Sequence, residues 1–136
     1  MPEKRTLKKA RAAKRAGKSP TTQAGEFVHE EIKHVREGKH GARSAKQAIA
    51  IGLSKARRAG VNLPPPPRTA KASTRRSAAS ATRAAKRHAH PSAKRSRAMR
   101  RKLQREPKNT VSTKALSRQA KSAARRRRRT GASARS

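Results

Sequence analysis

The large hydrophobic residues of this chain gather in one stretch, residues 19–63, which holds nine of the fifteen. From residue 24 onward, apolar side chains fall at positions 24, 27, 28, 32 and 35, which is one stripe at the period of an α-helix. A second stripe runs through positions 45, 48, 49, 52, 53 and 56. The pattern predicts two amphipathic helices that form a hairpin, over residues 20–37 and 45–59.

Signals at the helix ends support this prediction. Ser19 before Pro20 is typical of a helix start, because the serine side chain caps exposed backbone N–H groups and proline suits the first turn. Ser44 opens the sequence SAKQ, which fits a capping box. Gly38 and Gly60 are predicted to end the two helices in the left-handed conformation that glycine adopts readily.

Outside this stretch the chain is mainly Ala, Lys, Arg and Ser, with little to bury. Such a composition cannot offset the conformational entropy lost on folding. We therefore predict a mainly α protein: a small two-helix hairpin flanked by disordered or transiently helical basic arms. The expected divisions are a basic N-terminal arm (1–18), the hairpin module (19–63), a polyproline spacer (64–67) and a disordered basic tail (68–136), within which residues 92–106 and 112–129 can become helical.

The net charge of the chain indicates the class of its binding partner. The 136 residues include 40 Lys and Arg against six Asp and Glu, which gives a net charge of +34. A chain of this charge attracts polyanions, and nucleic acid is the commonest of these in a cell. Each cation that neutralises a phosphate releases counterions, so the affinity needs no sequence preference. Phe27 is the single aromatic residue, which argues against a platform for stacking unpaired bases, and DNA is the more favoured nucleic acid.

The candidate nucleic-acid-binding residues are the clustered cations of both arms and of the second helix end. They are Lys8, Lys9, Arg11, Lys14, Arg15, Arg57, Arg58, Arg75, Arg76, Arg100, Arg101, Lys102, Arg125, Arg126, Arg127, Arg128 and Arg129.

No catalytic, cofactor or metal site is predicted, and we expect no enzyme and no small-molecule substrate. His29 and His34 flank two glutamates as in the HExxH motif, but they are five residues apart and so do not share a helix face as zinc ligands must. His88 and His90 are interpreted as solvated tail residues, although the pair could take a stray metal ion.

The four glutamates of the hairpin are interpreted as surface charge on a helix, with no cleft to shield an acid–base pair. They could instead dock the chain's own arms, or a basic partner, and so temper nucleic-acid binding. They are Glu26, Glu30, Glu31 and Glu37.

Three further interpretations of the sequence are less favoured. The sequence before Ser44 could place a phosphate at the helix N-terminus with Lys39 and Arg43. A helix-turn-helix reader of base edges is disfavoured, since the second helix offers little more than Lys46 and Gln47 to read them. No apolar run approaches a membrane span, no bulky apolar face suits a membrane surface, and no secretory signal is expected.

Residues 16–66, with the words SPTTQAGEFV, REGKHGARSAKQAIAIGLSKARRAG and a proline run, resemble a family of short, very basic bacterial proteins. That family is functionally uncharacterised, so the resemblance implies a bacterial, intracellular protein with a shared module and supplies no site residues. His29 stands where the family has arginine. The tail is similar in composition to the tails of linker histones and bacterial histone-like proteins.

The leading functional hypothesis is therefore a histone-like protein of the bacterial nucleoid that binds nucleic acid without sequence preference. The basic arms would coat phosphates, and the hairpin would associate with itself as a homodimer or dock a partner, since two helices leave apolar surface uncovered. The alternatives are an RNA- or ribosome-associated basic protein and a protein–protein adaptor anchored to DNA by its tail.

Overall fold

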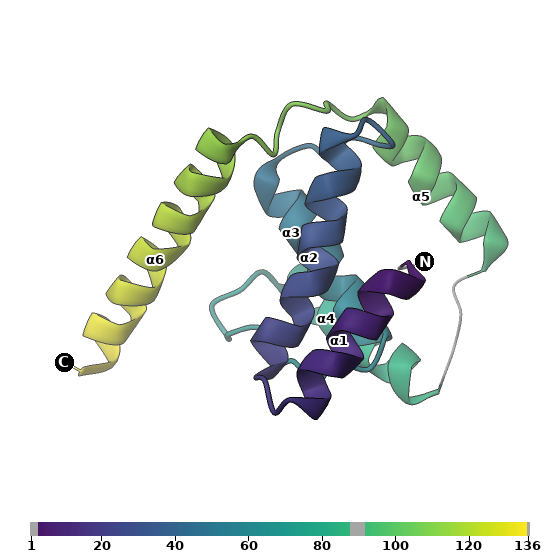
Figure 1. The fold of residues 1–136 in the computed structure, drawn as a ribbon. Coiled ribbons are helices and arrows are strands. Elements are labelled where there is room, and N and C mark those ends of the chain that lie inside the picture. Colours follow the sequence, from purple (N-terminus) through teal and green to yellow (C-terminus); the bar gives the residue numbers. More distant parts are fainter. Residues whose placement is uncertain (1–2, 88–91, 136) are drawn as a thin grey trace.

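The computed structural model describes residues 3–87 and 92–135, and across these ranges every regular element is an α-helix (Figure 1). The helices are α1 (Lys4–Arg15), α2 (Pro20–Arg36), α3 (Ala45–Arg58), α4 (Ala72–Lys86), α5 (Ala93–Arg105) and α6 (Thr113–Arg135). Helices α1 to α4 pack into one body, with α2 and α3 at its centre.

The ends of α2 and α3 agree with the sequence signals. Ser19 and Ser44 accept hydrogen bonds from the third backbone N–H after them, at 3.3 and 3.1 Å. Gly38 and Gly60 follow the two helices with φ angles of 74° and 96°. Local sequence therefore determines where both central helices begin and end.

A glycine lets α2 and α3 approach closely. A Cβ added at Gly52 of α3 would lie 2.6 Å from the Cα of Val28 in α2, which no side chain tolerates. Alanines continue the contact, since Ala24 of α2 and Ala56 of α3 are fully buried beside Phe27. Small residues therefore let the two backbones come close together, and Phe27, the single aromatic side chain, packs beside this contact.

Helix α1 covers one side of this pair. Ala10 is buried against Phe27, and Leu7 packs on the same cluster from its edge. Figure 1 shows α1 lying across α2. The N-terminal segment thus adds to the core through one leucine and one alanine.

Helix α4 packs on α3 after the proline-rich connection. Ala81 is fully buried and Ala84 nearly so, and both lie on one face of α4. In the connection, Leu63 packs on the core formed by α1, α2 and α3. Helix α4 therefore uses alanines, and no large side chain, to contact the body.

The segment between α5 and α6 holds the loop that joins α2 to α3. Gly41 N–H donates to the Leu103 carbonyl at 2.7 Å, and Ala42 N–H donates to the Pro107 carbonyl at 2.8 Å. A Cβ at Gly41 would overlap the backbone of Glu106. Val111 is buried beside Ala42, so segments about 65 residues apart in the chain share one small core.

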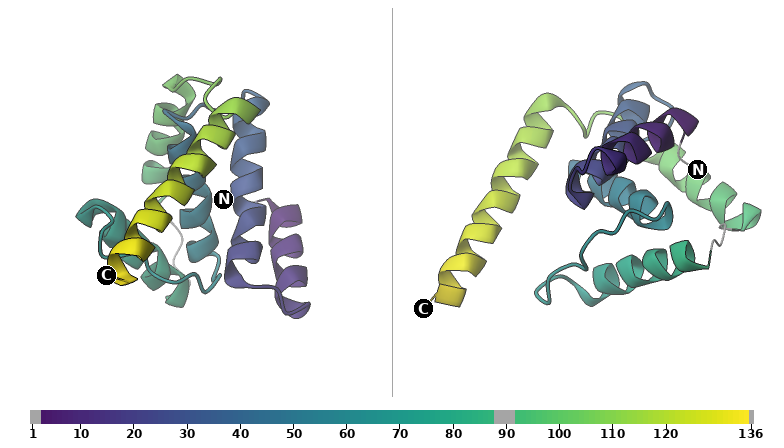
Figure 2. Two further views of the ribbon diagram at one scale, coloured as in Figure 1. Left: turned by 90° about the vertical axis from the view of Figure 1, so that its left-hand side faces the viewer. Right: turned by 60° about the horizontal axis from the view of Figure 1, so that its bottom comes forward.

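Helices α5 and α6 extend from opposite sides of the body (Figures 1 and 2). Helix α6 contacts α3 near its own first turns and then projects away. Helix α5 has no extended packing against another described helix, and Leu103 at its end is its buried residue. Both helices present most of their surface to solvent.

The predicted fold, a two-helix hairpin flanked by disordered or transiently helical basic arms, is therefore wrong. Both arms are helical, and α1 and α4 pack on the hairpin. The prediction rested on the number of large apolar residues. These contacts are instead made by alanines such as Ala10, Ala81 and Ala84, because helices that approach closely can pack through small side chains. Backbone hydrogen bonds from Gly41 and Ala42 to the carbonyls of Leu103 and Pro107 add a link that no local pattern reveals.

We predict that Gly52→Ala lowers the free energy of unfolding by about 1–3 kcal/mol, because the added methyl group forces the two central helices apart. Gly25→Ala is the matched control, since Gly25 is a helical glycine of α2 with no atom within 4 Å of its added Cβ. That variant should be neutral or more stable by up to about 1 kcal/mol. Urea denaturation followed by far-UV circular dichroism measures both, and equal stability of the two variants would contradict the close approach.

Candidate functional site

The candidate cations of α1 all face solvent. Thr6 and Ala10 form the buried side of this helix, and the basic residues occupy its remaining surface. The exposed candidates are Lys8, Lys9, Arg11, Lys14 and Arg15. Because no acidic residue lies on α1 itself, its outer surface is uniformly basic.

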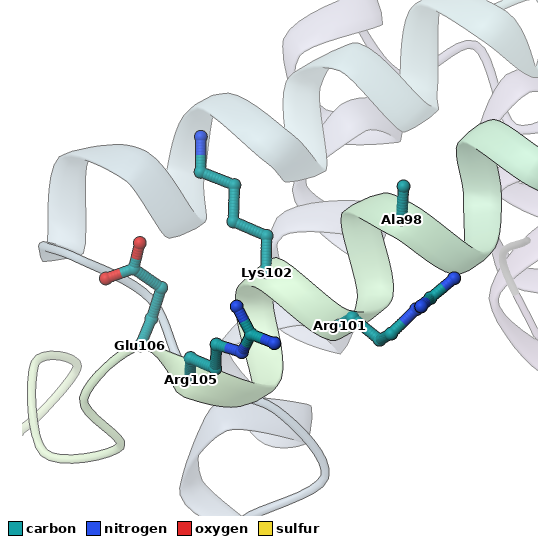
Figure 3. Close-up of a pocket in the computed structure, with 5 residues that line it drawn as sticks. All are labelled: Ala98, Arg101, Lys102, Arg105 and Glu106. Atoms are coloured by element: carbon teal, nitrogen blue, oxygen red, sulfur yellow. The ribbon is translucent and has the colours of Figure 1, made fainter.

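Helices α4 and α5 carry the next candidates, and these are also exposed: Arg75, Arg76, Arg100, Arg101 and Lys102. An open hollow of about 480 Å³ lies along α5 (Figure 3). Lys102 and Arg105 extend to the same side as Glu106, and Arg101 points elsewhere along the helix. The hollow is an open basic surface and does not enclose a small molecule.

Helix α6 carries the five consecutive arginines 125–129, all exposed. Successive residues of an α-helix are turned by about 100°, so five in a row place guanidinium groups on every side of it. This segment was predicted to lie in a disordered tail and to become helical only transiently, and it is part of a 23-residue helix.

Arg57 differs from the other candidates. Its guanidinium donates hydrogen bonds to the backbone carbonyls of Leu63 and Pro64, at 3.4 and 2.9 Å, and its burial lowers its pKa. Its neighbour Arg58 is exposed. Arg57 therefore holds the proline-rich connection against the end of α3, whereas Arg58 can meet a phosphate.

A second open hollow, of about 550 Å³, lies between the start of α3 and the first turns of α6. Arg43, Lys46 and Arg118 bring three cations to it. Lys39, which the sequence grouped with Arg43 as a phosphate ligand, instead lies 3.8 Å from Glu3 and 3.5 Å from Glu37. The basic surface at the start of α3 is thus built with α6 and without Lys39.

Two of the four hairpin glutamates are buried, so their interpretation as surface charge is wrong. Glu30 and Glu31 expose 5% and 0% of their surface. Glu30 Oε1 accepts hydrogen bonds from the backbone N–H of Glu3 at 2.7 Å and from Thr6 Oγ1 at 3.0 Å. This carboxylate caps the start of α1 and docks the N-terminal arm on α2.

Glu31 joins α2 to two other segments. Its Oε1 accepts a hydrogen bond from Lys55 of α3, and its Oε2 lies 3.3 Å from Nε2 of His40 in the α2–α3 loop. The other ring nitrogen of His40, Nδ1, lies 2.9 Å from the carbonyl oxygen of Gly41. Glu31 is therefore a buried anion with a cation on one side and an imidazole on the other.

His34 lies next to this pair. Its Nε2 is 3.0 Å from Glu3 Oε1, and its ring meets that of His40 edge to face at 6.0 Å. The hydrogen bond from His34 is the largest cause of a lowered pKa at the exposed Glu3 carboxyl, and the charges of His34 and Lys39 add to it. Two overlapping groups, Glu31 with His34 and His40, and Glu3 with Glu30 and His34, each place their ligand atoms within 4.8 Å of one another.

Sequence reasoning missed these groups because it tested the wrong pair of histidines. His29, the first of that pair, is exposed. The informative spacing is Glu31 to His34, three residues apart on one helix face, with His40 just past the glycine that ends α2. His88 and His90, the other pair considered, lie outside the described residues.

The fold and these surfaces define a small, strongly basic protein, all-helical in its described residues, in which Glu3, Glu30 and Glu31 make contacts between segments of the fold. No helix in the described part of the chain is long and apolar enough to cross a bilayer. Residues 11–67 match the model of a family of unknown function, DUF6496. This match overlaps the segment that resembles short basic bacterial proteins, a resemblance that stays a prediction. Searches of curated proteins and of solved structures each found no match.

We predict that Glu31→Gln lowers the free energy of unfolding by about 2 kcal/mol, because Lys55 loses a charged hydrogen-bond partner at a largely buried position. Glu26→Gln, the same change at a partly exposed position of α2, should cost less than about 0.5 kcal/mol. Thermal denaturation of both variants measures the difference. Equal losses would show that Glu31 does no more than a surface charge.

A second prediction concerns pH. The lowered pKa of Glu3 means that its carboxylate stabilises the fold above its ordinary value of 4.5, and that this contribution disappears as the pH falls through the lower folded value. The wild-type protein should exceed Glu3→Gln in stability at about pH 5–6, where the Glu3 carboxylate is charged. The difference should vanish at more acidic pH in urea titrations, and a difference that persists there would contradict the ionic contact.

Proposed function

We propose that this protein binds nucleic acid without sequence preference, with DNA as the favoured partner, and that it acts as a histone-like, non-enzymatic component of a bacterial nucleoid. The observation that carries the proposal is the separation of charge in the fold. The two buried carboxylates, Glu30 and Glu31, lie between α1, α2, α3 and the loop, and clustered cations cover the outer surfaces.

Half of the six acidic residues are engaged in contacts between segments of the fold. Glu30 caps α1, Glu31 pairs with Lys55, and Glu3 contacts His34. From residue 68 to the end, 24 lysines and arginines accompany the single acid Glu106. The surface of α4, α5 and α6 therefore lacks the carboxylates that would screen its charge from a polyanion.

The arrangement of α5 and α6 supports contact with more than one stretch of DNA. The two helices lie on opposite sides of the body, and both are basic along their length (Figures 1 and 2). A body with a cationic helix on each side can hold two duplexes near each other, or two parts of one bent duplex. This geometry supports the proposal that a monomer compacts DNA.

Bridging by a dimer of hairpins has less support than the sequence suggested. That idea rested on apolar surface left uncovered by two helices. In the described residues α1, α4 and Val111 cover this surface, and the one large apolar side chain that is exposed is Met99 of α5. We therefore base the proposal on the monomer.

Binding to duplex DNA should weaken steeply with salt, with a log–log slope of about −9 if roughly ten phosphates are contacted. Replacing Arg125, Arg127, Arg128 and Arg129 by glutamine should reduce the slope by about 3–4. Fluorescence anisotropy with unrelated duplexes of equal length measures the slope and the sequence preference. A slope near −1, or strong preference for one duplex, would contradict the proposal.

Arg57 and Arg58 provide a matched pair of single variants. Arg58→Gln should reduce the slope by about 1, whereas Arg57→Gln should leave it unchanged and lower stability instead, because Arg57 is bound to backbone carbonyls. Protein recovered from cells and treated with DNase or RNase distinguishes the two nucleic acids. Release by RNase alone would favour the RNA-associated alternative.

A further inference from the structure

We propose that Glu31, His34 and His40 form a binding site for one divalent transition-metal ion of the Zn²⁺ class, which ties the α2–α3 loop to α2. This site goes beyond nucleic-acid binding and uses none of the proposed phosphate contacts. Imidazole and carboxylate ligands suit zinc, and two histidines with one glutamate are a known zinc ligand set.

The protonation of His40 is the first argument. A carbonyl oxygen can only accept a hydrogen bond, so the 2.9 Å contact with Gly41 places the proton of the neutral ring on Nδ1. The lone pair of Nε2 then faces Glu31 Oε2 at 3.3 Å. Two acceptors that face each other need a cation between or beside them, either a second proton on the ring or a metal ion.

The second argument is the state of Glu31. Its side chain is 1% exposed, and Oε2 has no hydrogen-bond partner although Oε1 is bound to Lys55. A buried carboxylate oxygen without a partner is costly, and a metal bond removes that cost. The contact with Lys55 orients the carboxylate, as hydrogen bonds to metal ligands commonly do, and the Gly41 carbonyl does the same for His40.

The third argument is the short distance between the ligand atoms. One ligand atom from each of Glu31, His34 and His40 lies within 4.8 Å of the others. Bonds of about 2.0–2.2 Å to a tetrahedral ion require somewhat shorter separations, which side-chain rotation supplies. Glu3 Oε1, 3.0 Å from His34 Nε2, is the next oxygen available as a fourth ligand. Glu3, Glu30 and Glu31 bring three carboxylates near this point, and Lys39 and Lys55 lie against two of them.

Isothermal titration of Zn²⁺ into chelator-treated, nucleic-acid-free full-length protein tests the site. We expect one equivalent to bind, and the unfolding midpoint to rise with zinc concentration because the ion binds the folded state. His34→Gln and His40→Gln should each weaken binding by more than about 100-fold, since loss of a ligand exceeds the cost of losing its supporting contact.

Two controls keep the test decisive. His29→Gln changes an exposed histidine of the same helix and should bind zinc as the wild type does. The double change His88→Gln and His90→Gln should also leave binding intact, and loss of binding there would overturn the proposal. Cobalt in the wild-type protein gives a readout independent of variant folding: intense visible absorption that zinc abolishes supports a tetrahedral site, and its absence contradicts one.

Discussion

Two consecutive buried carboxylates on α2 hold together the segments that surround this helix. Glu30 accepts hydrogen bonds from the start of α1. Glu31 accepts a hydrogen bond from Lys55 of α3 and faces His40 of the loop. In a chain of charge +34, anions are scarce, and each one placed between helices reduces the repulsion where the backbones meet. The docking of α1 uses the hydrogen bonds to Glu30, and Glu31 ties α3 to α2 in addition to the close contact at Gly52.

The parts of the fold that sequence could predict are those encoded by neighbouring residues. The stripes through Phe27 and Ala48, the serine caps and the glycine stops placed α2 and α3 within a residue or so of their observed ends. The docked arms escaped prediction because alanine contacts such as Ala10 and Ala81 leave no hydrophobic stripe of large residues. The link from residues 103–111 to the loop combines backbone hydrogen bonds with the Thr110 hydroxyl and the buried Val111 side chain, and no helical stripe in the sequence reveals it.

The candidate sites also divide into those that the sequence reveals and those that only the folded structure brings together. Exposed arginines and lysines could be identified from charge alone, because a polar surface needs no partner within the chain. The exception is Arg57, whose role depends on where the proline-rich connection runs. The group of Glu31, His34 and His40 needed the structure, since its third member joins the helix only through the turn at Gly38.

The two kinds of charge have different places in this molecule. Carboxylates help to organise a small body of α1 to α4, and cations on its outside and on α5 and α6 are the proposed contacts with a polyanion. Helix α6 illustrates the cost, because its five adjacent arginines repel one another until phosphates neutralise them. Binding of phosphates should therefore stabilise this part of α6, and the helix in turn holds the arginines in fixed relative positions.

The central claim is that the outer cations bind DNA irrespective of sequence. Crosslinking in the native cell, followed by sequencing of the attached nucleic acid, tests it most directly. The account predicts DNA fragments spread over the chromosome without a shared motif. Recovery of mainly RNA, or of a few DNA sites that share one sequence, would contradict it.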